Sequence, residues 1–170
     1  DLHVRGRRQR QMCIRDRPPG LAGRPLATLR HLACASPHYL AERGHPQHPR
    51  DLEHHACITL GEDERDRHWR FERAGESATV AVRGRYVANH SEVRLEAALS
   101  HLGIASLPGF TARAALARGD LVTVLPDWEH KTSYAGTAWV LYPSHRFLPA
   151  KLRVWICLLY TSDAADDSLR

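Results

Sequence analysis

The sequence has no long uninterrupted apolar run, and 25% of its 170 residues are charged. A helix that crosses a membrane needs about 20 mainly apolar residues, so we expect no membrane-spanning helix. Residues 1–17 carry charge throughout and lack the apolar stretch of a secretory signal. With 43% hydrophobic residues, the composition is typical of one soluble globular domain, and we expect it to be cytoplasmic.

Cysteine is also scarce, and the sequence lacks the common catalytic motifs. The four cysteines form no CxxC pair and are too few for a disulfide framework, which favours a reducing compartment. Cys34 and Cys57 lie in apolar stretches, where thiols are usually inert. No GxSxG, Walker loop or GxGxxG is present. We therefore expect no catalytic residues, no enzyme activity and no cofactor.

Histidine, in contrast, is plentiful, with 12 residues in the chain. The densest group is His54-His55-Ala56-Cys57, with His45 and His48 upstream. Zinc sites use ligand pairs at fixed spacing, and neither HExxH nor CxxC…CxxC occurs here. We therefore expect no metal site, and we assign these histidines to a loop and a helix end.

The two ends of the chain share an unusual feature. Residues 7–17 read RRQRQMCIRDR, and residues 157–167 read CLLYTSDAADD. Back-translation of MCIRDR and CLLYTS gives mutually complementary DNA, which resembles the transposase end sequence of sequencing libraries. We therefore interpret 1–17 and 157–170 as non-native, adapter-derived tails and leave them out of the fold. The remaining 17 basic and 14 acidic residues do not indicate a nucleic-acid groove.

Between these ends, helical and strand patterns alternate. Ser36 followed by Pro37 predicts a capped helix that ends at Gly44, and Ser91 and Gly103 predict the two ends of another. Residues 109–119 and 147–156 have helical periodicity. Strands are predicted at 29–36, 56–60, 69–73, 77–85, 86–90, 104–108, 120–126 and 138–143, with a charged hairpin loop at 61–68 and a loop at 127–137. This alternation predicts an α/β fold.

The junction Asn89–Glu92, with the sequence NHSE, carries the clearest sign of binding. It follows an apolar strand and opens a helix, whose free N–H groups and partial positive charge suit an anionic or carboxylate ligand. Ordinary helix capping explains the same residues, and the sequence leaves both explanations open.

The order of several motifs resembles a known family. ASPHYLAERGHPQHPRDLEHHACI is followed by WRF, VRGRYVANHSEVRLEAALSHLGIASLPGF, LVTVLPDW and LYPSHRFLPAKLRVWI. Together these motifs resemble the C-terminal effector-binding domain of LysR-type transcriptional regulators. The resemblance implies a fold like a type II periplasmic binding protein, with two α/β subdomains joined by a hinge and a small-molecule site between them.

By this resemblance, residues 18–156 form a partial, truncated effector-binding domain. Residues 36–116 correspond to the second subdomain, whereas 18–35 and 120–156 are parts of an incomplete first subdomain. The hinge is bordered by Ser36 and Pro37. The implied effector-binding residues are Cys57, Ile58, Asn89, His90, Ser91, Gly103, Ile104 and Ala105.

The family also implies the partners. These are a small-molecule effector, a second copy in a homodimer or homotetramer of the full-length protein, and DNA, contacted only through an N-terminal helix-turn-helix that this sequence lacks. A solute-binding protein of a transport system shares the fold and is the alternative function.

Overall fold

The computed structural model describes residues 20–61, 63–143, 150–151 and 154–155. The predicted tails, 1–17 and 157–170, lie outside the described residues. The elements in chain order are β1 (Leu21–Leu29), β2 (His31–Ala35), α1 (Pro37–Arg43), the 3₁₀ helix η2 (Pro49–His54), β3 (Cys57–Ile58), the 3₁₀ helix η3 (Glu64–Arg67), β4 (His68–Arg73), β5 (Glu76–Ala81), α2 (Ser91–Leu99), β6 (Ile104–Pro108), α3 (Gly109–Arg118), β7 (Val122–Thr123), β8 (Glu129–Lys131) and β9 (Gly136–Pro143).

The chain divides into two compact units. Unit 1 contains Asp1–Thr28 and Thr137–Arg170, and unit 2 contains Leu29–Gly136. The described part of unit 1 is a two-stranded sheet of β1 and β9. The predicted subdomain boundaries differ from this division, because 29–35 and 120–136 lie in unit 2. Hydrogen-bonded pairing explains the difference, since β2 pairs with β6, β7 and β8.

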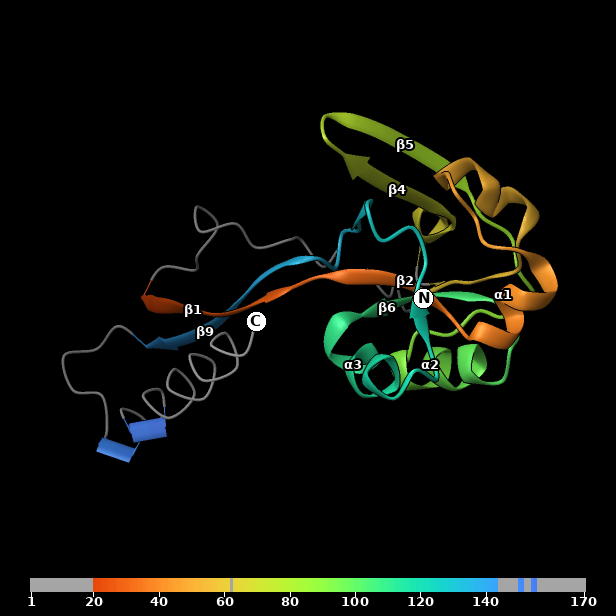
Figure 1. The fold of residues 1–170 in the computed structure, drawn as a ribbon. Helices are drawn as coiled ribbons and strands as arrows, with labels where there is room; N and C mark the ends of the chain where they lie inside the picture. Colours follow the sequence, from red (N-terminus) through yellow and green to blue (C-terminus); the bar gives the residue numbers. More distant parts are fainter. Residues whose placement is uncertain (1–19, 62, 144–149, 152–153, 156–170) are drawn as a thin grey trace, which may run out of the picture. The chain divides into compact units, whose positions relative to one another are not determined.

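Unit 2 is built on a seven-stranded mixed sheet (Figure 1). Its strand order is β3-β6-β2-β8-β4-β5, and β7 pairs with β2 outside this path. β3 runs parallel to β6, whereas β2 is antiparallel to both β6 and β8, and β4 is antiparallel to both β8 and β5. The mixed sheet and its helices confirm the predicted α/β class.

Both faces of this sheet are covered, and alternate residues of one strand enter different cores. In β6, Ile104 belongs to the core that also holds Tyr39, Leu40, Trp69 and Phe71. The next residue, Ala105, belongs to the core on the other face, where α2 and α3 contribute Ala97, Ala98, Ala112 and Ala115. Small residues on both helices allow them to lie close to the sheet, and Figure 1 shows them side by side.

The helix ends follow the predicted signals at α1 and α3. Ser36 Oγ accepts a hydrogen bond from the Tyr39 N–H at 3.2 Å, and Pro37 is the first helical residue. Gly44 follows the last turn of α1, and its N–H donates to the Leu40 carbonyl at 2.9 Å. α3 ends at Gly119, which adopts the left-handed conformation.

Replacement of Ser36 by alanine should lower the free energy of unfolding by about 1–2 kcal/mol, because an N-cap is lost. The hydroxyl is buried and also lies 2.7 Å from His101 Nδ1, so a second hydrogen bond disappears. Urea unfolding measures the change, with Ser77→Ala at an exposed position of β5 as the control. Equal stability of the two variants would contradict the cap assignment.

Other predicted elements are wrong in detail. α2 begins one residue after its N-cap His90, which makes no side-chain capping bond, and it ends at Leu99, before Gly103. Segment 61–68 contains η3 and is not a hairpin loop, because the hairpin turn lies between β4 and β5. Residues 86–90 make only an isolated bridge at Val87. β8, inside the predicted loop 127–137, pairs with two strands of the sheet.

Candidate functional site

A cavity of about 220 Å³ lies in unit 2. Leu60, just after β3, and Ser106, the middle residue of β6, line it. The carboxyl end of a parallel strand is a common place for a ligand in α/β folds, and Leu60 lies at that end of β3. The other lining residues are His31, Arg65, Asp66, His68, Trp69, Arg94, His130, Lys131, Thr132, Ser133 and Tyr134.

Arg94 places a buried positive charge at this cavity. The residue is 2% exposed and comes from the second turn of α2. Its Nε donates to the Ser106 carbonyl at 3.1 Å and its Nη1 to the Ala88 carbonyl at 2.7 Å. Both acceptors are backbone carbonyls, and they hold the guanidinium against β6 and the segment that precedes α2.

Two histidines form a second feature of the cavity. His31 and His130 are direct partners in the β2–β8 pair and are 8% and 4% exposed. The His31 Nδ1 lies 3.4 Å from Ser106 Oγ. The His130 ring stacks on Phe71 with the centroids 4.7 Å apart, and Trp69 lies 5.1 Å away.

Both imidazoles are neutral near pH 7. Burial lowers the pKa of His31 to about 4, and the charge of Arg94 lowers it further. Burial also lowers the pKa of His130 to about 3, with a smaller contribution from His31. A neutral imidazole offers one donor and one acceptor. The cavity wall therefore contains the Arg94 guanidinium and two neutral imidazoles, which are polar groups able to bind a ligand's hydrogen-bonding atoms.

The rim of the cavity is held by hydrogen bonds and ion pairs. Lys131 Nζ lies 2.6 Å from a Glu129 carboxylate oxygen and 3.7 Å from one of Glu72. Thr132 Oγ1 accepts from the Tyr134 N–H at 3.1 Å. These contacts fix the segment after β8 in place, so part of the cavity wall exists before any ligand binds.

The predicted residues of β3 and β6 lie beside the cavity and do not line it. Cys57 pairs with Ile104 and Ile58 with Ala105 in the parallel ladder, and all four side chains are in the two cores. Gly103 is buried against the backbone of Ala56, which explains its small size without a ligand. Their predicted role in effector binding stays a prediction.

The predicted residues at the start of α2 do not line the cavity either. Asn89 and His90 are exposed, and the half-buried Ser91 Oγ accepts a hydrogen bond from Thr111 Oγ1 at 3.2 Å. The prediction that Ser91 caps α2 is wrong, because His90 occupies the cap position. Contact of these three residues with an effector stays a prediction, whereas Arg94 of the same helix does line the cavity.

Ser36 and Pro37 lie at the start of α1, inside unit 2 and not at its boundary with unit 1. A hinge role for them stays a prediction.

Sequence reasoning missed Arg94 because an arginine in a helix usually faces solvent. The apolar residue before it, Val93, is 40% exposed. The buried residues of α2 are Arg94, Ala97 and Ala98, which have the i, i+3, i+4 spacing of one helix face. The spacing of Arg94 with Ala97 and Ala98 was the sequence signal that indicated a buried position for Arg94.

The histidine group around His54 and the two described cysteines, Cys34 and Cys57, lie outside the lining of this cavity. Among the described residues, no set of three or more His, Cys, Asp or Glu side chains is placed to hold a metal ion. Burial raises the pKa of Cys34 and Cys57 to about 12, so both remain thiols near neutral pH. Within the described part of the chain, no helix has the length and apolar character to cross a membrane.

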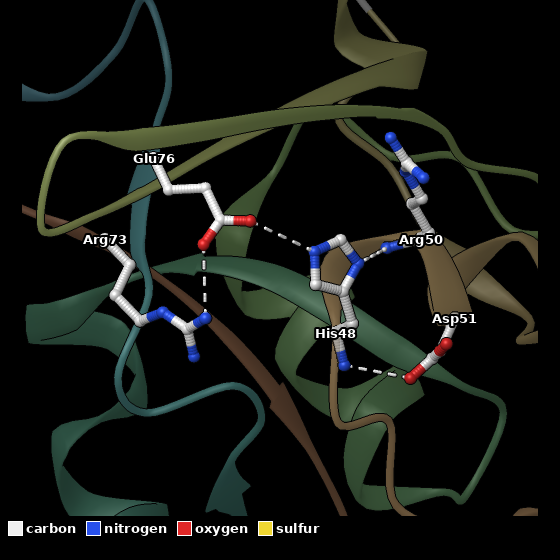
Figure 2. Close-up of polar contacts among 5 residues, drawn as sticks. All are labelled: His48, Arg50, Asp51, Arg73 and Glu76. Carbon is white, nitrogen blue, oxygen red and sulfur yellow. Dashed lines mark hydrogen bonds and ion pairs between the residues drawn. The ribbon is translucent and has the colours of Figure 1, made fainter.

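A second hollow, of about 320 Å³, is lined by 45–47, 123–128 and Arg73. Figure 2 shows the polar network beside it. Glu76 lies 3.2 Å from Arg73 Nη2 and 3.7 Å from His48 Nε2, and the Arg73 guanidinium lies 4.3 Å above the Trp128 ring. His48 Nδ1 accepts a hydrogen bond from the Arg50 backbone N–H, and the His48 backbone N–H donates to the Asp51 carboxylate. These partners satisfy one another, which favours a structural role.

Comparison with known proteins identifies the family. The family model described as "LysR substrate binding domain" matches residues 1–162. The chain belongs to this family. The match includes residues 1–17, which we interpret from the sequence as an adapter-derived tail. The adapter origin of both ends stays a prediction.

Relatives of this LysR substrate-binding domain are named as regulators of transcription. The probable HTH-type transcriptional regulator LtrA of Klebsiella pneumoniae is 51% identical over 144 residues, which are 84% of this chain and 47% of that protein. This chain therefore spans about half the length of the curated relatives it matches.

Solved structures agree with this assignment. The full-length Vibrio cholerae virulence activator AphB, described as a member of the LTTR protein family, has a TM-score of 0.74 at 27% identity over 86% of this chain and 49% of that chain. The regulatory domain of CrgA, a LysR-type transcriptional regulator from Neisseria meningitidis, has a TM-score of 0.71 at 27% identity over 90% and 72%. The predicted periplasmic-binding-protein-like fold is confirmed by these neighbours.

Proposed function

We propose that this chain is the effector-binding module of a LysR-type transcriptional regulator and binds a small molecule in the cavity of unit 2. The observation that carries the proposal is the cavity beside β3 and β6, whose wall includes the buried Arg94, His31 and His130. The neighbouring residues predicted from the sequence, Asn89 to Ser91 above all, are proposed as additional contacts.

In this proposal the module is a sensor and not a catalyst. The ligand acts by favouring one conformation of the effector domain over another, since a ligand shifts an equilibrium only by its difference in affinity for the two states. The longer regulator works in the cytoplasm as a homodimer or homotetramer, and it contacts DNA through its helix-turn-helix. The printed names of the relatives support this role.

A ligand screen tests the proposal. Compounds that bind the native chain raise its unfolding temperature, because binding to the folded state alone adds stability by mass action. Thr132→Trp fills the cavity from its rim and should abolish these shifts, whereas Thr79→Trp at an exposed position of β5 should preserve them. Shifts of equal size in both variants would place the ligand elsewhere and contradict the proposal.

A further inference from the structure

Trp128 carries a buried hydrogen-bond donor without an acceptor. The residue is 6% exposed, and its indole Nε1 has no hydrogen-bond partner among the described residues. The one other buried side chain of which this is true there, His130, lines the cavity of the proposed function. A buried donor without an acceptor destabilises the folded chain, and such groups in native structures usually have a reason. Because Trp128 lines the second hollow, a molecule bound there can supply the missing acceptor.

The segment that carries Trp128 bulges out of the sheet. β7 and β8 both pair with β2, and between them residues 124–129 pass residues 32–33 of β2, so the longer segment must leave the ladder. Within it Leu125 has a φ of 56°, a left-handed conformation that is unfavourable for a residue with a side chain. Bulges redirect side chains and are common beside functional sites. This bulge forms one wall of the second hollow.

The rest of the wall is held in place by the chain itself. In the loop 45–47, the Gln47 N–H donates to the Asp51 carboxylate at 2.9 Å. Arg73, at the end of β4, donates to the Glu76 carboxylate through Nη2 at 3.2 Å, as Figure 2 shows. The hollow is therefore formed before a ligand binds, which lowers the cost of binding.

The second hollow presents groups for both a negative and a positive charge. Of the acidic and basic side chains that line it, Arg73 is basic and Asp127 is acidic. A guanidinium has five N–H donors, and Glu76 engages Arg73 only at Nη2, so donors remain for a ligand. The exposed Asp127 carboxylate makes no hydrogen bond or ion pair with any described residue. A ligand that carries both charges matches both side chains.

The size and the apolar part of the wall suit a small amino acid. The volume of about 320 Å³ lies within the range of pockets that bind small molecules. Apolar contact comes from Pro46, Val124, Leu125 and Pro126. An α-amino acid with an apolar side chain combines these features, since its carboxyl and amino groups are both charged near neutral pH.

We propose that the second hollow binds a small α-amino acid with an apolar side chain in its zwitterionic form. The ligand carboxylate accepts hydrogen bonds from the Trp128 indole N–H and the Arg73 guanidinium, and the ligand ammonium pairs with Asp127. No covalent bond forms or breaks, and no proton is transferred. The hollow is separate from the cavity lined by His31 and His130, so the inference does not depend on the proposed function.

L-leucine tests the inference on the whole chain, with glycine as a smaller amino acid. Proton–nitrogen NMR follows the indole N–H signals of Trp128 and Trp69, and a Trp128→Phe variant assigns the first signal by its loss. Leucine should shift the Trp128 signal saturably and leave the Trp69 signal unchanged, because Trp69 lines the other cavity. Leucine is for this reason left out of the ligand screen of that cavity. A shift of the Trp69 signal alone would overturn the inference.

Two analogues of leucine separate its charges. Isocaproate lacks the ammonium group, and isopentylamine lacks the carboxylate. Each should bind at least tenfold more weakly than leucine, because each loses charge-assisted hydrogen bonds to the wall. Equal affinity of leucine and either analogue would contradict recognition of a zwitterion.

Asp127→Asn should weaken leucine binding at least tenfold, because the ligand ammonium loses its carboxylate partner. Asp127 is exposed, so the substitution leaves the core intact. Glu96→Gln removes an exposed acid of α2 outside the hollow and is the matched control, with unchanged leucine affinity. Normal leucine affinity of Asp127→Asn, or no saturable shift of the Trp128 signal with either leucine or glycine, overturns the inference.

Discussion

Replacement of Arg94 by methionine should lower the free energy of unfolding by about 2–4 kcal/mol and abolish ligand binding in the cavity. The carbonyls of Ser106 and Ala88 lose their guanidinium donors, and each buried carbonyl left without a donor costs about 1–3 kcal/mol. Methionine has a similar length and no charge, so the loss reflects the polar contacts more than packing. Urea unfolding gives the stability change, and calorimetry below the unfolding temperature gives the binding change.

Arg118→Met is the matched control for this experiment. Arg118 is exposed at the end of α3 and pairs with Asp120 at 2.7 Å, and exposed pairs contribute about 0–1 kcal/mol. Arg94→Lys keeps the charge but cannot reach both carbonyls with one ammonium group, so we expect an intermediate stability. A stable Arg94→Met variant that binds ligand normally would remove Arg94 from the site.

Replacement of Gly103 by alanine should cost about 3 kcal/mol or more. A Cβ at this position overlaps the Ala56 carbonyl oxygen and lies 2.9 Å from the Ala56 carbonyl carbon, and the φ of +156° is one that other residues rarely adopt. The hydrogen bond from the Ile104 N–H to this carbonyl, 2.9 Å long, must lengthen to make room. Overpacking and backbone strain each cost about 1–3 kcal/mol.

Gly119→Ala separates the clash from the strain. Gly119 has a φ of +79°, but a Cβ there meets nothing within 4 Å. This variant should therefore lose only about 1 kcal/mol, the penalty of an L side chain in that region. If the two alanine variants unfold at the same urea concentration, the close approach of Gly103 to β3 does not contribute.

The sequence predicted the elements whose signals are local. The strand β6 was predicted with the bounds that it has, because an apolar run lies between two glycines. α1 and α3 were predicted from the cap Ser36 and the terminal glycines Gly44 and Gly119, and these residues act as expected. Each signal depends on a few neighbouring residues, so one sequence is sufficient.

The elements that it did not predict depend on distant pairing. β8 has three residues, two of them charged, and only His130 points into the core. It is a strand because β2 and β4 lie on either side of it. The same is true of the site, because His31 and His130 are far apart in the sequence and become neighbours only through that pairing. No spacing rule relates them.

Arg94, the charged residue in the cavity wall, was not predicted for a different reason. Arg94 lies in a row with small residues on α2. Its side chain donates to two backbone carbonyls, and no sequence motif indicates such contacts. The sequence did predict an anion-binding feature at the start of this helix. The structure adds the cavity and the cation, and it leaves the proposed contacts of Asn89 and Ser91 to experiment.

The most direct test of a ligand site at the cavity lined by Arg94, His31 and His130 uses two tryptophans as reporters. Trp69 lines the proposed cavity, with its indole N–H donating to the Asp66 carbonyl at 3.1 Å, and Trp128 lines the second hollow. Proton–nitrogen NMR spectra with and without a stabilising compound follow both indole N–H signals. We expect a saturable shift of the Trp69 signal with the Trp128 signal unchanged, and a shift confined to Trp128 would contradict ligand binding in this cavity.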